Sequence, residues 1–144
     1  MFYIGIDPGK KGGIAVISPT EIAVYPYSDE TLRIVLSSLT NEDCRCCLEQ
    51  VHSMPQQGVK STFALGASYG YIKGVLESFG ISYQEIQPQR WKKEFGLNSD
   101  KAISIDTCKR LFPAIALRAS DRCRTDHDGM AEALLMAEYA RRKL

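Results

Sequence analysis

The first nine residues constrain the fold of this chain most strongly. An apolar run, Phe2–Ile6, ends on the carboxylate of Asp7, and Pro8 and Gly9 then turn the chain. Apolar and β-branched residues in a run of this length predict a buried strand. Open sheets place their ligands at the carboxyl ends of strands, and an unpaired buried charge is costly, so Asp7 predicts a positively charged ligand. Our candidate is a divalent metal ion.

The remaining pattern predicts one α/β domain over residues 1–144, with a mixed five-stranded sheet flanked by helices. Three strands joined by tight turns form an antiparallel meander, and a strand reached through a helix lies parallel to the first. Ser28 and Ser99 are the expected N-caps of the first and fourth helices. We expect strands at 2–7, 14–17, 21–25, 44–49 and 81–86, and helices at 28–40, 61–79, 88–96, 99–112 and 125–142.

Length and apolar runs limit the class of protein. A chain of 144 residues suits one domain with one core. No apolar run approaches the roughly 20 residues that cross a bilayer, so we expect no membrane partner. The first strand begins at residue 2, which leaves no room for a signal peptide before it. We therefore expect a cytoplasmic protein.

The five cysteines, an odd number, indicate reduced thiols in an intracellular protein. Cys44, Cys46 and Cys47 lack the second, spaced pair of ligands that a structural zinc site needs. We expect these three side chains to fill a buried strand.

Charge is unevenly distributed along the chain, although the net charge is only +1. Acidic side chains outnumber basic ones before residue 87, and basic side chains outnumber acidic ones after it. The second part is therefore the expected polyanion-binding face. The alternative is a chance unevenness on a solvated surface.

Two segments in the middle of the chain have patterns that ordinary packing does not require. Residues 51–60 contain Gly, Pro and Gln without periodicity, which predicts a long loop with a functional role. The next helix carries Gly66, Gly70 and Gly74 in one stripe. Glycine costs about 1 kcal/mol at an interior helix position, so we expect another backbone to approach here. That backbone belongs either to the sheet or to a partner subunit.

Four acidic residues are predicted to converge. Asp7 and Glu49 end two strands that should be parallel neighbours, while Asp128 and Glu132 share one face of an apolar helix. Crowded carboxylates repel one another unless a cation neutralises them. Oxygen ligands suit Mg²⁺, with Mn²⁺ as the alternative. Four carboxylates suit two ions per site, about 4 Å apart, on either side of a scissile phosphate.

Three of these acids also have a structural alternative. Glu49 could pair with an arginine, Asp128 could be the N-cap of its helix, and Glu132 could be a surface acid. Asp7 has few such alternatives, because Asp-Pro-Gly at a strand end serves no obvious packing purpose.

The chain resembles the RuvC family of Holliday-junction resolvases, within the RNase H-like superfold, and especially its compact phage-type members. The resemblance covers nearly the whole chain, and its first and last motifs are the most specific. It is carried by Tyr3–Gly9, Leu48–Glu49, Pro88–Lys93, Lys101, Leu111–Pro113 and Asp126–Ala137.

The resemblance implies a crossover junction endonuclease. Such an enzyme resolves four-way DNA junctions by paired symmetric nicks that leave 5′-phosphate and 3′-hydroxyl ends. It implies that Asp7, Glu49, Asp128 and Glu132 are the catalytic, metal-binding acids. Many members have an aspartate three residues after the third acid, whereas Glu132 follows Asp128 by four. Asp126 is therefore a candidate to replace or assist Asp128.

The basic residues of the second part fit DNA phosphate contacts. Lys92 or Lys101 is the candidate for stabilising charge on the scissile phosphate. The loop at 51–60 resembles the segment that reaches the junction centre in this family. The candidate DNA contacts are Arg90, Lys92, Lys93 and Lys101, with Gln56 and Lys60 from the loop.

Three further expectations concern packing and assembly. Trp91 is expected to be a core anchor rather than a base-stacking platform. His127 lies between two candidate ligands and is a candidate to support one of them. The helix at 61–79 resembles the family's dimer helix, and a two-fold homodimer would supply the two sites that paired nicks need.

Other functions remain as alternatives. One is another RNase H-like nuclease, either an RNA–DNA hybrid cutter or an RNA-processing relative similar to YqgF. In RNase H itself the glutamate lies on the first helix, where this chain has Glu30, whereas Glu49 ends a strand. A junction-binding protein without catalysis is disfavoured because all four acids are present. An actin-like ATPase would need two such domains.

Overall fold

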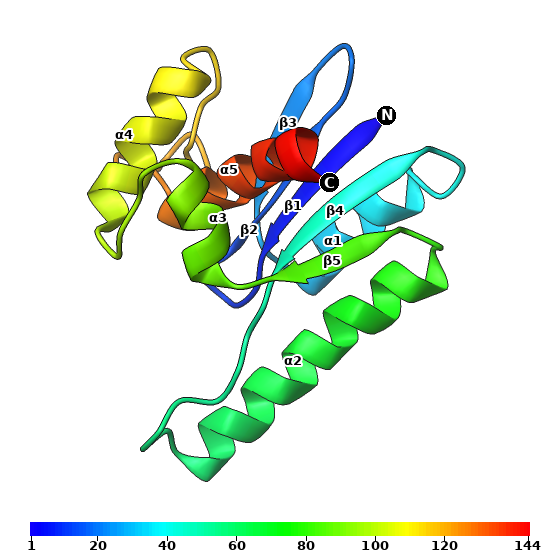
Figure 1. The fold of residues 1–144 in the computed structure, drawn as a ribbon, viewed down its shortest axis with the longest axis vertical. Coiled ribbons are helices and arrows are strands. Elements are labelled where there is room, and N and C mark those ends of the chain that lie inside the picture. The colour runs from blue at the N-terminus through cyan, green and yellow to red at the C-terminus, as the bar shows by residue number, and fades with distance from the viewer.

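The computed structural model describes all 144 residues and has the predicted order of elements (Figure 1). Five strands form one sheet in the order β3-β2-β1-β4-β5. The strands are β1 Phe2–Asp7, β2 Gly13–Ile17, β3 Ile22–Pro26, β4 Cys44–Glu49 and β5 Tyr83–Ile86. The helices are α1 Asp29–Ser37, α2 Val59–Ser78, α3 Pro88–Glu94, α4 Lys101–Leu111 and α5 Asp128–Lys143.

The pairing of the strands confirms the predicted mixed sheet. β1 pairs antiparallel with β2, and β2 pairs antiparallel with β3, which makes the N-terminal meander. β4 follows α1 and pairs in parallel with β1, and β5 pairs in parallel with β4. The carboxyl ends of β1, β4 and β5 therefore lie at one edge of the sheet, where such folds place their ligands.

Helices cover both faces of the sheet, so each face has its own apolar core (Figure 1). α5 packs along β1 and β2 on one face, with α3 and α4 against it. α1 and α2 cover the other face, above Ile4 and Ile6 of β1. The side-chain position of Gly5 is on the face that α5 covers, because successive strand residues alternate between the two faces. A Cβ on Gly5 would collide with the backbone of Ala133, so this glycine lets α5 lie directly against the sheet.

The structure corrects the predicted cap of α4. Ser99 is not the N-cap; instead the side chain of Asp100 accepts a hydrogen bond from the backbone N–H of Ala102 at 2.9 Å. Asn98 accepts a hydrogen bond from the backbone N–H of Asp100, and this local turn places Asp100 at the cap position. Ser28 caps α1 as predicted, although α1 and β5 are both shorter than expected.

The cysteines confirm the prediction that they are packing residues. Cys44, Cys46 and Cys47 are buried in β4 and divide between the two cores. All five thiols are free, and Cys123 alone among them is not buried.

The first half of α2 projects beyond the sheet, and the loop that precedes α2 is its neighbour there (Figure 1). A Cβ on Gly66, Gly70 or Gly74 would meet no atom within 4 Å, so the sheet is not the backbone that this stripe approaches. The alternative of an approach to the sheet is therefore wrong, and the approach of a partner subunit stays a prediction. No helix, α2 included, has the length and apolar character needed to cross a membrane.

Candidate active site

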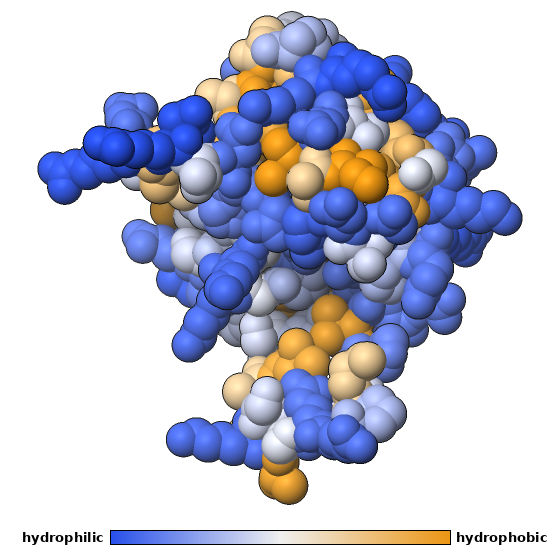
Figure 2. All heavy atoms as spheres, turned by 90° about the vertical axis from the view of Figure 1, so that its left-hand side faces the viewer, coloured by the Kyte–Doolittle hydropathy of each residue, from blue (hydrophilic) through white to orange (hydrophobic).

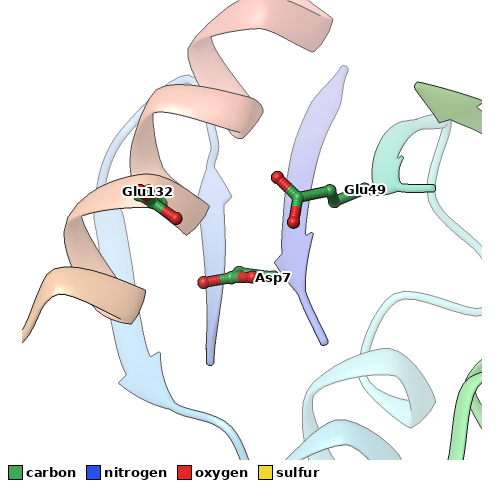
Figure 3. Close-up of side chains that lie close together, drawn as sticks. All are labelled: Asp7, Glu49 and Glu132. Carbon is green, nitrogen blue, oxygen red and sulfur yellow. The ribbon is translucent and has the colours of Figure 1, made fainter. Parts of the chain in front are cut away.

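Three of the four predicted acids converge at the carboxyl ends of β1 and β4 (Figure 3). Asp7 is the last residue of β1, Glu49 is the last residue of β4, and Glu132 projects from α5. One carboxylate oxygen from each residue lies within 4.8 Å of the other two. The three side chains point toward one another, and we call them the acid cluster.

Glycine contacts hold the start of α5 against the turn between β1 and β2. A Cβ on Gly13 would collide with the carbonyl of Gly129, and a Cβ on Gly129 would collide with the carbonyl of Lys11. A side chain at either position would displace backbone. This close packing holds the first turns of α5 over the strand ends and so brings Glu132 to Asp7.

The acid cluster concentrates negative charge where little water can reach. Glu132 is only 2% exposed. Burial, followed by the charges of Glu49 and Glu132, holds the pKa of Asp7 well above its ordinary value, and Lys101 opposes this only in part. Burial also raises the pKa of Glu49, although the hydrogen bond from Trp91 opposes the rise. The cluster is therefore short of positive charge.

Two lysines approach the acid cluster, both at Glu132. Lys101 Nζ lies 2.8 Å from Oε1 of Glu132 and 3.7 Å from Oδ2 of Asp128. Lys92 Nζ lies 3.9 Å from the same oxygen of Glu132. Burial lowers the pKa of the Lys101 ammonium, but the hydrogen bond to Glu132 and the nearby carboxylates outweigh it and raise the pKa. Lys101 therefore remains charged, and two ammonium groups face four carboxylates.

The fourth predicted acid, Asp128, and its candidate substitute, Asp126, lie outside the cluster and in different surroundings. Asp128, the first residue of α5, lines a shallow hollow together with Asp7 and the turn between β1 and β2. Asp126 forms ion pairs with Lys109 and Arg118. These cations hold Asp126 apart from the cluster, so Asp128 is the acid that shares a surface with Asp7.

His127 caps α5. Its Nδ1 accepts a hydrogen bond from the backbone N–H of Met130 at 3.0 Å. Asp128 is the first helical residue and not the cap, contrary to one of the structural alternatives. His127 thus supports the site indirectly, because the start of the helix fixes where Asp128 and Glu132 lie.

Trp91 has a contact that the sequence interpretation missed. It is fully buried, as predicted for a core anchor. Its indole Nε1–H also donates a hydrogen bond to Oε2 of Glu49 at 2.8 Å. A buried tryptophan usually finds an acceptor for its N–H. The sequence shows that Glu49 could accept such a hydrogen bond. It does not show that α3 lies beside the end of β4, which only the fold reveals.

The predicted DNA contacts divide between side chains in solvent and side chains that face the site. Lys92 and Lys101 face Glu132. The sequence interpretation missed Lys10 and Lys11, which are exposed and line the hollow beside Asp7. Their signal was their position directly after Asp-Pro-Gly. The other predicted contacts are all exposed: Arg90, Lys93, Gln56 and Lys60. The predicted loop at 51–60 is shorter than expected, because α2 begins at Val59 and Lys60 therefore lies on the helix.

Solved structures share this architecture. No protein-family model and no curated protein matches the sequence. The RuvC structure of Thermus thermophilus matches with a TM-score of 0.61 and 17% identity, over 99% of this chain and 96% of that chain. T. thermophilus RuvC in complex with Holliday junction substrate matches with a TM-score of 0.62 and 13% identity, over 99% and 97%. This chain has the RuvC fold.

The RuvC fold confirms the architecture that the sequence resemblance implied. At these identities the similarity concerns the fold, so the role of each side chain rests on its own geometry. Glu30 is exposed in the first turn of α1 and lies outside the acid cluster. Glu49, at the end of β4, is the glutamate that stands beside Asp7.

The acid cluster of this RuvC fold fits a hard divalent cation. Its donors are all carboxylate oxygens, and the cysteine thiols are no part of it. Mg²⁺ and Mn²⁺ prefer such ligands. The shortage of positive charge gives a physical reason for binding, because a cation would relieve the repulsion among the buried carboxylates.

Proposed function

We propose that this protein is a structure-selective endonuclease that resolves four-way DNA junctions by paired symmetric nicks and depends on Mg²⁺ or Mn²⁺. The observation that carries the proposal is the three-carboxylate cluster at the strand ends of a RuvC fold that spans 99% of the chain. A matching T. thermophilus RuvC structure is a complex with Holliday junction substrate.

In this proposal the acid cluster and Asp128 hold two ions. Asp7 belongs to the acid cluster and also lines the hollow with Asp128, so it is the residue placed to contact both ions. Bound divalent ions would supply positive charge to the scissile phosphate and lower the pKa of an attacking water. The products would carry 5′-phosphate and 3′-hydroxyl ends.

In this proposal the lysines orient the Glu132 carboxylate and neutralise negative charge on the DNA phosphate. Lys101 holds Glu132 through a hydrogen bond of 2.8 Å, while its side chain remains 53% exposed and within reach of a DNA phosphate. Lys92 supports the same carboxylate from α3. Preorganised cations near a phosphate stabilise the charge that develops on it. Lys10 and Lys11 line the same hollow as Asp7 and Lys101, so a DNA strand that enters it would meet basic side chains from the turn between β1 and β2 and from α4.

Paired nicks also require two sites related by a two-fold axis, and we propose that α2 makes the dimer contact. Figure 2 shows apolar side chains gathered on the projecting end of the molecule, where α2 begins. Val59 is 89% exposed and Phe63 is 78% exposed. With the open glycine stripe, these residues give α2 a surface suited to close packing against its own copy.

The test is cleavage of a labelled synthetic four-way junction in Mg²⁺, beside linear duplex and an RNA–DNA hybrid. We expect symmetric nicks in the junction alone. Glu49→Gln should bind the junction without cutting it. Glu30→Gln is the matched control, since it removes an exposed glutamate from the first helix and should cut normally.

Each contrary result has a distinct meaning. Cleavage of the hybrid, with the junction neither cut nor preferentially bound, would replace the proposal with an RNase H-type activity. Binding of the junction without cleavage in any divalent ion would leave only a junction-binding protein.

A further inference from the structure

We propose that Trp91 is a positioning residue, whose indole N–H fixes one oxygen of Glu49 and thereby presents the other oxygen to a metal ion. The inference rests on the proposed function of Glu49 as a metal ligand. It extends that proposal to a residue that contacts neither the ion nor the DNA and acts only through Glu49.

The core fixes the position of the indole. Trp91 is fully buried and packs in the apolar cluster that contains Cys47 and Ile86. Ile86 ends β5 and is the register partner of Glu49, and α3 begins two residues later. The same short connection therefore anchors the end of β4 and the helix that supplies the donor.

The chemistry of the donor suits this task. An indole offers one N–H donor and no acceptor, so it can hold only an oxygen that carries a lone pair. At 2.8 Å from Oε2 it occupies one oxygen of Glu49 and leaves Oε1 without a protein partner. Side-chain groups that orient a metal ligand in this way typically tune metal affinity by about 10–100-fold.

A neutral donor also preserves the charge of the carboxylate. Glu132 is held by the ammonium of Lys101, which cancels part of its charge. An arginine or lysine on Glu49 would fix its geometry equally well but would compete with a bound cation. Trp91 fixes the orientation and leaves Glu49 with its full negative charge for the ion.

The neighbouring residue, Lys92, contacts a second of the three carboxylates of the cluster. Lys92 Nζ lies 5.5 Å from the centroid of the Trp91 ring and 3.9 Å from Glu132. Consecutive residues of α3 therefore contact Glu49 and Glu132. Because Trp91 is the only tryptophan of the chain, its fluorescence should report on this site alone.

The test replaces Trp91 with its benzothiophene analogue, in which sulfur takes the place of the N–H in a ring of nearly the same shape. Mg²⁺ affinity is measured without DNA by isothermal titration calorimetry, and the Mg²⁺ midpoint is the ion concentration at which the site is half-saturated. We expect the analogue to need about 10–100-fold more Mg²⁺ than the wild type. Phe95→Leu, which removes an aromatic ring at the end of α3 without touching Glu49, should leave the Mg²⁺ midpoint unchanged.

Two further readouts separate positioning from packing. The emission of Trp91 in the wild type should change with Mg²⁺ at the same midpoint as the calorimetric titration, and Glu49→Gln should abolish that response. In junction cleavage the analogue should lower kcat and leave the affinity for the junction unchanged. Trp91→Phe should resemble the analogue in metal dependence but melt at a lower temperature, because it also leaves a cavity.

Equal Mg²⁺ midpoints for the wild type and the analogue would overturn the positioning role, even if the wild type cuts junctions. If the analogue needs more Mg²⁺ than the wild type but the wild type does not cut junctions, the role of Trp91 is supported. The proposal that four-way junctions are the substrate is then wrong. The two proposals therefore fail separately.

Discussion

The two buried glutamates of α5 lie on one helix and meet opposite surroundings. Glu132 and Glu138 are each 2% exposed. Glu138 accepts hydrogen bonds from Arg141 at 2.6 and 2.7 Å and from Arg142 at 2.8 Å. Glu132 has one close ammonium group, from Lys101, and shares its surroundings with other carboxylates.

The difference shows that burial alone does not identify a functional acid. Burial raises the pKa of Glu138, but its two arginines outweigh burial and hold the pKa below its ordinary value. In the acid cluster around Glu132, burial and neighbouring carboxylates outweigh the nearby cations, and the pKa values of Asp7 and Glu49 are raised. A fully paired carboxylate serves the fold, whereas a group of carboxylates short of cations is prepared for a ligand that the chain does not supply.

The largest expected effect comes from neutralising each glutamate in turn, which tests whether Glu132 is functional and Glu138 structural. Glu132→Gln should reduce junction cleavage at least about a thousandfold, as loss of an essential catalytic group does. Glu138→Gln should leave cleavage unchanged and cost about 1 kcal/mol of unfolding free energy, because the arginines it releases are half-exposed and can turn to water. Cleavage rates and urea unfolding of both variants measure the two effects. A large loss of activity in Glu138→Gln would erase the distinction.

The cations that pair with the two glutamates should differ in the same way: the one at Glu132 should matter for activity, and the one at Glu138 for stability. Lys101→Met removes the ammonium that orients Glu132 and should slow cleavage by about a hundredfold. Arg141→Met removes a cation of the same helix from Glu138 and should change only stability, by less than about 1 kcal/mol, since Arg142 remains. Single-turnover rates under saturating enzyme separate the chemical step from binding. Equal rates for the two variants would show that Lys101 has no part in the reaction.

Much of the site could be predicted from the sequence because its signals are local. Asp7 and Glu49 follow apolar strands directly, and the spacing of Asp128 and Glu132 is a helix period. Strand order then follows from general rules about crossover connections. The acid cluster needs little beyond these two kinds of information.

The remaining contacts depend on how distant elements dock. Trp91 and Glu49 are 42 positions apart, and no sequence period relates them. Glu138 sits among arginines in an ordinary polar-looking segment, so only the packing of α5 on the sheet reveals that it is buried. Ser99 failed as a cap because an adjacent Asn98 turn competed for the same few residues.

Metal-free stability should depend on pH in opposite directions at the two sites. The folded-state pKa of Asp7 is raised, so its contribution to stability is present at acid pH and is lost as pH rises through that pKa. The pKa of Glu138 is lowered, so its contribution is present above the unfolded-state pKa and is lost as pH falls. With a chelator present, Asp7→Asn should therefore raise the melting temperature at neutral pH, and Glu138→Gln should lower it.

Mg²⁺ should offset the destabilisation that Asp7 causes at neutral pH in every protein that keeps the Asp7 carboxylate. At about a hundred times its dissociation constant, an ion that binds the folded state alone adds about 2.7 kcal/mol. Melting curves with and without Mg²⁺ should show this rise for the wild type and Glu138→Gln, and little rise for Asp7→Asn. A metal-free Asp7→Asn protein that is less stable than the wild type would mean that Asp7 has a structural partner in the fold.

The smallest expected effect compares cations at the two ends of α5. Lys10 lies beside Asp7 near the start of the helix, whereas Lys143 at its end pairs with Glu94. If Lys10 contacts a phosphate, Lys10→Ala should lower the dependence of junction affinity on salt by about one released counterion, uniformly across junction sequences. Lys143→Ala should leave the slope unchanged, because that lysine is at the other end of α5 and pairs with Glu94 of α3. Binding titrations of catalytically inactive Glu49→Gln protein over a series of salt concentrations measure both slopes. Equal slopes would place the DNA path away from the turn between β1 and β2, and the acid cluster would then be approached from α3 and α4 alone.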